Sequence, residues 1–165
     1  MILYLVRHGI AVEQGTPGFK DAERPLTEEG IERMQKAARG LARQLDPPDL
    51  IASSTLLRAK QTAEILAAAL QSRDGVAEWP ELSPASAPHQ TINLLTERAA
   101  SHKSVMLVGH EPHISSLAAL LLGAAPYSIT FKKGATCALM CARVPTPGKA
   151  ELLWFLTPKQ LRHLA

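Results

Sequence analysis

Three short apolar runs in this chain are each followed by a cation or an imidazole. The runs and the side chains that follow them are 1–6 with Arg7 and His8, 49–53 with Arg58, and 104–108 with His110. In an open parallel sheet, ligands bind beyond the carboxyl ends of the strands, where side chains from distant segments meet. A lone histidine at a strand end is more often structural, but three such ends together predict a shared active site.

These residues belong to longer motifs. In chain order the motifs are Arg7-His8-Gly9, the turn Arg24-Pro25-Leu26-Thr27, the segment 53–62 around Arg58, and Gly109-His110. In that order they resemble the histidine phosphatase superfamily, and the resemblance spans nearly the whole chain. The short length and the segments 80–84 and 131–134 resemble its SixA-type branch, the phosphohistidine phosphatases. This resemblance implies a phosphoglycerate mutase-like fold and catalysis that needs no metal or cofactor.

The two arginines and His8 suit the transfer of a phosphoryl group. Such transfer is catalysed chiefly by positioning the group and neutralising charge on its equatorial oxygens. Arg7 and Arg58 each offer paired donors in a planar fork that stays charged. His8 is the predicted nucleophile, whose neutral ring attacks phosphorus to form a phosphohistidine that water then hydrolyses. The nearby cations should keep the ring neutral, and its other nitrogen should donate to a backbone carbonyl.

Four further residues surround this predicted centre. His110 should donate a hydrogen bond to an equatorial oxygen as negative charge develops. Gly9 would let the backbone turn tightly beside the phosphate, although an ordinary strand-to-loop glycine explains the residue equally well. Arg24, by resemblance to SixA-type proteins, is expected to support the phosphate from a loop. His113 is expected at the rim or in a structural role, and not as a metal ligand.

The sequence shows no recognisable general acid. Mutases and many ester phosphatases of the superfamily carry one on a longer segment after the second helix, whereas residues 72–88 are few and neither Glu78 nor Glu81 stands in an acid motif. A phosphohistidine needs less help, because imidazole, with a pKa of about 6.5, leaves readily once protonated. The sequence therefore predicts a protein phosphohistidine phosphatase. Two alternatives stay open: a small-molecule phosphate-ester phosphatase with Glu78 or Glu81 as acid, and a noncatalytic phosphoprotein-binding module.

Length and charge narrow the class of protein. The 165 residues, 46% of them hydrophobic, suffice for one core and are too few for two, which predicts a single domain over 1–165. The net charge of +3 is dispersed, and aromatic residues make up only 4% of the chain, so a nucleic-acid partner is not expected.

Neither a signal peptide nor a membrane-spanning run is visible, so no membrane partner is expected. Cys137 and Cys141 lie in an apolar run, 136–142, and are predicted to be buried thiols and not metal ligands. Reduced thiols fit a cytoplasmic enzyme. The oligomeric state is left open.

Alternating helices and strands must position these residues. Apolar residues three to four apart predict helices that begin near Thr27 and end before Asp46, span 55–71, pass through Ile92 to Ala99, and run from about Pro112 to Leu122. Strands are expected at 1–6, 49–53, 104–108, 136–142 and 150–155. The alternation predicts an α/β fold, a three-layer sandwich with a mainly parallel central sheet flanked by helices.

Overall fold

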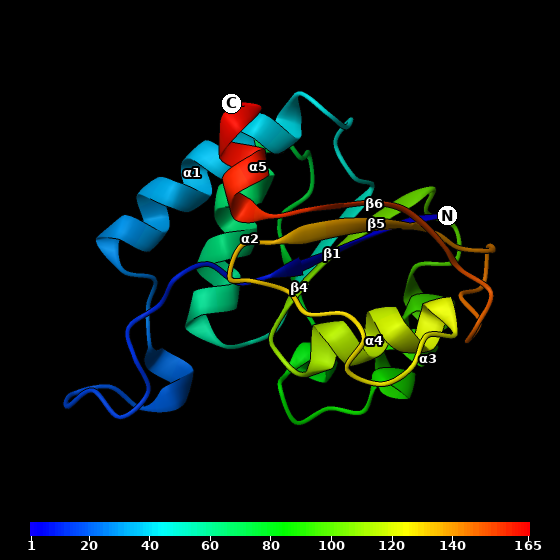
Figure 1. Ribbon diagram of the computed structural model, residues 1–165, viewed down its shortest axis with the longest axis horizontal. Coiled ribbons are helices and arrows are strands. Elements are labelled where there is room, and N and C mark those ends of the chain that lie inside the picture. Colours follow the sequence, from blue (N-terminus) through cyan, green and yellow to red (C-terminus); the bar gives the residue numbers. More distant parts are fainter.

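A computed structural model describes residues 1–165 as a six-stranded sheet with helices on both faces (Figure 1). The strands are β1 (Ile2–Arg7), β2 (Leu50–Ser53), β3 (Ala77–Glu78), β4 (Ser104–Gly109), β5 (Thr136–Met140) and β6 (Glu151–Leu156). The helices are α1 (Glu28–Ala42), α2 (Leu57–Leu70), α3 (Pro88–Arg98), α4 (His113–Leu122) and α5 (Pro158–His163), with short 3-10 turns η1 (Asp21–Glu23) and η2 (Pro80–Leu82).

The sheet order is β3-β2-β4-β1-β5-β6. The first four of these strands pair in parallel, whereas β5 runs antiparallel to both of its neighbours. The predicted mainly parallel sheet is therefore confirmed. Because β2, β4 and β1 are adjacent and parallel, the three chemistry-bearing strand ends lie side by side at one edge of the sheet.

Two apolar layers hold the helices against the sheet. The helices α1, α2 and α5 cover one face and α3 and α4 the other (Figure 1). Side chains alternate between these layers along β1, with Leu3 and Leu5 in one and Tyr4 and Val6 in the other. The three-layer sandwich is thus confirmed.

Both cysteines, Cys137 and Cys141, are buried free thiols, as predicted. Burial raises the pKa of the Cys137 thiol to about 12, so it stays protonated. No helix is long and apolar enough to cross a membrane.

The predicted α1 begins where its capping residue indicates. The Thr27 side chain accepts a hydrogen bond from the Gly30 N–H at 3.0 Å, which satisfies one of the free donors of the first turn. The helix buries Met34, Ala38 and Leu41, which lie on one face at helical spacing. Asp46-Pro47-Pro48 follows its end, as expected.

Four short elements were not predicted: β3, η1, η2 and α5. β3 has two residues, the 3-10 turns have three each and α5 has six, all too short for a periodic apolar pattern. α5 nevertheless carries a local signal, because Thr157 and Gln160 form a capping box and Pro158 stands at the first helical position.

Candidate active site

The strand ends bring His8, Arg58 and His110 to one place. Arg7 pairs with Gly109 across β1 and β4, and the His8 N–H donates to the Gly109 carbonyl at 3.0 Å. On the other side of β4, the Ser54 N–H donates to the Val108 carbonyl. Arg58 follows in the first turn of α2. The backbone ladder therefore places side chains about 50 residues apart in sequence beside one another.

These side chains line a cavity of about 430 Å³ that has no hydrophobic lining residue. The lining residues are Arg7, His8, Glu13, Gln14, Asp21, Arg24, Arg58, Pro84, His110, Glu111 and Lys133. Such a cavity suits a charged, strongly hydrated ligand. Its four Arg and Lys residues exceed its three carboxylates, which favours an anion.

His8 is held as a neutral ring with one free nitrogen. Its Nδ1 lies 2.7 Å from the Gly9 carbonyl, which can only accept, so Nδ1 carries the proton and Nε2 keeps a lone pair. The residue is 7% exposed. Burial first, and then the positive charges of Arg58, Arg7 and Lys133, lower the pKa of His8 to about 3. This is the state that a nucleophile requires.

His110 lies next to His8, with ring centroids 4.9 Å apart. Burial, followed by the neighbouring His8, lowers the pKa of His110 to about 2. Its Nε2 lies 2.8 Å from the Ser54 hydroxyl, and its buried Nδ1 has no hydrogen-bond partner. If the Ser54 hydroxyl donates to Nε2, the ring proton stands on Nδ1 and is available to an acceptor.

The two arginines are anchored at one end and free at the other. Arg7 Nη1 donates to the Phe131 carbonyl at 2.6 Å, and Arg58 Nη1 donates to the Asp21 carbonyl at 2.8 Å. The Nε atoms of both side chains are buried without a partner. Buried N–H groups without acceptors cost free energy, so a ligand that offered acceptors to these two atoms would stabilise the site.

Arg24 lines the cavity and is joined to Arg58 through Asp21. Its Nε and Nη2 donate to Asp21 Oδ1 at 3.0 and 2.7 Å, while Asp21 Oδ2 lies 3.4 Å from Arg58 Nη2. The hydrogen bond from Arg24 is the main cause that lowers the pKa of Asp21. The carboxylate thus links two guanidinium groups that line the cavity.

Gly9 and His113 lie outside the cavity wall. The Gly9 N–H donates to Thr62 Oγ1, and a Cβ at this position would stand 2.6 Å from Met34 Cγ. Close packing against α1 therefore accounts for the glycine in this structure. His113 is buried, with Nε2 near the Thr91 hydroxyl and Nδ1 near the Ser86 carbonyl, so it joins α4 to α3 and the loop before it.

Several cavity residues escaped sequence reasoning, namely Glu13, Gln14, Asp21, Pro84, Glu111 and Lys133. Three of them stood within recognised motifs but were given no role at the site: Glu111 next to His110, Lys133 in the segment 131–134 and Pro84 in the segment 80–84. Glu13, Gln14 and Asp21 come from a segment whose course depends on distant contacts, so no local pattern marks them.

Neither Glu78 nor Glu81 lines the cavity. Glu78 forms an ion pair with Lys60 at 2.7 Å. Glu81 belongs to η2, where its carbonyl accepts from the Thr91 hydroxyl. No group of three His, Cys, Asp or Glu side chains is arranged to hold a metal ion.

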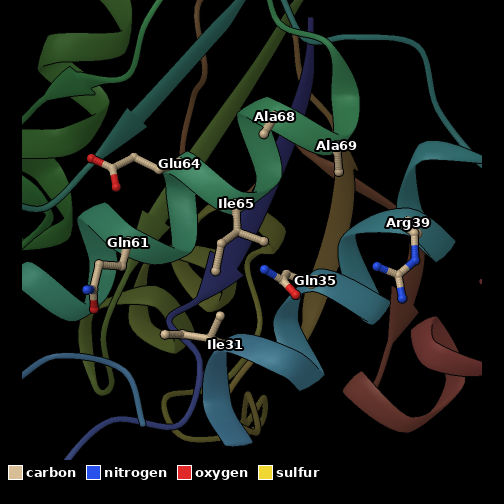
Figure 2. Close-up of a pocket in the computed structure, with 8 residues that line it drawn as sticks. All are labelled: Ile31, Gln35, Arg39, Gln61, Glu64, Ile65, Ala68 and Ala69. Atoms are coloured by element: carbon tan, nitrogen blue, oxygen red, sulfur yellow. The ribbon is translucent and has the colours of Figure 1, made fainter. Parts of the chain in front are cut away.

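A second hollow, of about 570 Å³, lies between α1 and α2 (Figure 2). Ile31 from α1 and Ile65 from α2 point toward one another across it. It contains no histidine, and Arg39 and Glu64 are its only charged residues. It therefore lacks the groups that phosphoryl chemistry needs.

Sequence comparison identifies one family. The sequence profile of the histidine phosphatase superfamily (branch 1) matches residues 3–88. A protein of Picosynechococcus sp. without an assigned function is 34% identical, and the match covers 98% of this chain and 99% of that protein.

Solved structures share the fold over the whole length. The protein histidine phosphatase SixA complexed with tungstate matches with a TM-score of 0.83 and 25% identity, covering 98% of this chain and 99% of the other. The alpha-ribazole phosphatase of Shigella flexneri matches with a TM-score of 0.75, covering 96% and 97%, and at 21% identity that likeness shows the fold alone.

Proposed function

Because this chain belongs to the histidine phosphatase superfamily, we propose that it is a phosphohistidine phosphatase of the SixA type. It removes the phosphoryl group from a phosphorylated histidine on a partner protein, through a covalent intermediate on His8. Residues 1–165 act as one phosphatase domain that needs no metal or cofactor. The free thiols of Cys137 and Cys141 favour the cytoplasm as its compartment.

One observation carries the proposal: a neutral histidine lines a cavity without hydrophobic lining residues, beside buried donors that lack acceptors. The donors are Arg7 Nε and Arg58 Nε, and His110 Nδ1 is a third in the tautomer in which the Ser54 hydroxyl donates to His110 Nε2. Phosphate oxygens are acceptors with negative charge, and they supply what all three groups lack. The likeness to SixA in complex with tungstate, a tetrahedral oxyanion, supports the same ligand class.

In the first step, the Nε2 lone pair of His8 attacks phosphorus. A bond forms between His8 Nε2 and phosphorus, and the bond from phosphorus to the substrate imidazole breaks. Its electron pair goes to the departing ring nitrogen. Protonated beforehand on its second nitrogen, that ring leaves as neutral imidazole. Arg7, Arg58 and His110 hold the equatorial oxygens while charge develops.

In the second step, water attacks phosphorus and the bond to His8 Nε2 breaks. The electron pair returns to His8, the water proton passes to solvent, and inorganic phosphate is released. The Gly9 carbonyl keeps the proton of His8 on Nδ1 throughout. Arg24 supports both steps through Asp21, which holds it beside Arg58.

The substrate class rests on the leaving group. Glu78 is paired with Lys60, and Glu81 does not line the cavity, so neither stands ready to protonate an alkoxide. An imidazole leaves without such an acid. The likeness to SixA over 98% of the chain supports the same substrate.

A small-molecule phosphate ester is the second candidate substrate. Glu13 and Glu111 line the cavity, and a protonated carboxyl group there can give its proton to a leaving alkoxide. In this alternative the acid comes from these residues.

The test uses a phosphotransfer protein labelled with radioactive phosphate on histidine. We expect the wild-type phosphatase to release the label from the phosphotransfer protein in the presence of EDTA. His8→Ala should lower kcat/KM by at least about 10³-fold. His163→Ala, an exposed histidine of α5, is the matched control and should keep full activity.

Three outcomes contradict the proposal. Turnover by His8→Ala rules out the covalent step. A phosphosugar, phosphoglycerate or nucleotide with a kcat/KM orders of magnitude above that of phosphohistidine supports the ester alternative. Tight binding of the phosphoprotein with neither release nor acid-labile label on His8 supports a noncatalytic binding module.

A further inference from the structure

The loop of residues 131–134, named the 131–134 loop, forms one wall of the cavity. The Phe131 carbonyl accepts from Arg7 Nη1 at 2.6 Å, and Lys133 lines the cavity two residues later. At its far end, the Gly134 N–H donates to the carbonyls of Arg7 and His8, each at 3.0 Å. This loop therefore sets the place of one guanidinium and one ammonium group.

Glu111 anchors the first residue of this loop. Its Oε1 accepts from the Phe131 N–H at 3.0 Å and from the Ser115 hydroxyl at 2.6 Å. The Phe131 ring is fully buried, with its centroid 4.8 Å from that of Phe155. Phe131 is thus held by its ring, its N–H and its carbonyl, and two of these contacts, those with Glu111 and Arg7, come from residues that line the cavity.

We propose that Glu111 is a positioning residue, which holds Arg7 in place for the phosphoryl group through Phe131 and also holds the loop that carries Lys133. The role rests on the proposed function, since it concerns the same oxyanion site. This role depends on the length of the Glu111 side chain and not on its charge. A carboxylate beside an oxyanion repels it, whereas an acceptor that holds Arg7 in place strengthens its binding. The charge of Glu111 and its positioning of Arg7 are therefore expected to change oxyanion affinity in opposite directions.

Two variants, one isosteric and one shorter, separate the contribution of the Glu111 charge from that of its length. Glu111→Gln removes the charge and keeps an oxygen at the same distance from the Phe131 N–H. Glu111→Asp keeps the charge and shortens the side chain by one methylene, which withdraws that oxygen. The probe is tungstate, and its affinity is measured by isothermal titration calorimetry, a readout that needs no substrate turnover.

We expect Glu111→Asp to bind tungstate about tenfold more weakly than wild type, a change of about 1.4 kcal/mol. Glu111→Gln should bind at least as tightly as wild type. Ser115→Ala is the matched control, because it removes the other donor to the same oxygen and leaves the Phe131 bond, and it should bind like wild type. Circular dichroism checks that each variant is folded.

The reverse ranking overturns the proposal. If Glu111→Gln binds tungstate more weakly than Glu111→Asp, the charge of Glu111 matters and its reach does not. If all variants bind like wild type, Glu111 does not position Arg7. Because binding is measured without substrate, a failure to hydrolyse phosphohistidine would count against the proposed function alone.

Discussion

Arg58 shows how one guanidinium group can be held by hydrogen bonds and still keep a donor free for a ligand. Two of its nitrogens are engaged by Asp21, one with the carbonyl and one with the carboxylate, and its Nε is buried without a partner. The fork of a guanidinium makes this division possible, since its five N–H groups point in set directions. An ammonium group has one centre of charge and cannot serve two partners in the same way.

Arg58→Lys should therefore lower activity although the positive charge remains. We expect kcat/KM for the phosphohistidine substrate to fall by about 10²-fold, because a donor to the developing charge is lost. Steady-state kinetics measures the change, with Arg33→Lys on the exposed face of α1 as the matched control. A twofold effect or less would show that charge alone suffices at this position.

At the scale of elements, α1 approaches two other backbone segments closely through its glycines. A Cβ on Gly30 would lie 2.0 Å from the Ile10 carbonyl oxygen, and one on Gly40 would lie 1.9 Å from that of Leu161. The first contact fixes the segment that leaves His8, and the second seats α5. The helix thus packs against both the segment that follows His8 and helix α5.

Gly40→Ala should destabilise the fold by forcing α5 away from α1. We expect the free energy of unfolding to fall by about 2 kcal/mol, because the steric conflict outweighs the better helix propensity of alanine. Urea denaturation measures this free energy of unfolding. Gly75→Ala is the control, since a Cβ there meets no atom within 4 Å, and its effect should stay within about 0.5 kcal/mol. Equal stability of the two variants would contradict the close approach.

At the scale of the whole molecule, the site makes stability depend on pH. Burial is the main cause that lowers the pKa of His8, His110 and His113. The folded protein keeps these rings neutral, while the unfolded chain takes up protons below pH about 6.5. Their contribution to stability is fully present above that pH. It is lost as the pH falls toward the folded pKa values of about 3 for His8 and about 2 for His110.

The free energy of unfolding should fall between pH 7 and pH 5, by about 2 kcal/mol for each of His8 and His110. Asp21 and Asp49, whose pKa values lie below the ordinary 3.8, lose their contribution only at lower pH. Urea denaturation at pH 7, 6 and 5 measures the fall. His8→Asn should make it smaller, because one histidine no longer titrates. A flat profile would show that these rings are not held neutral.

The sequence by itself determined the main elements and the order of Arg7, His8, Arg58 and His110 at three strand ends. Such information is local, because apolar runs and helical spacing are visible within a few residues. It also indicated Thr27 as a helix cap, which the structure confirms.

Only the tertiary structure decided which loops surround those strand ends. Asp21 reaches Arg58 across 37 residues and Phe131 reaches Arg7 across 124. Contacts at such separations depend on the order of strands and on how loops pack, which no local pattern encodes. The contact of Glu111 with Phe131, and the position of Glu78 and Glu81 away from the cavity, became visible for this reason alone.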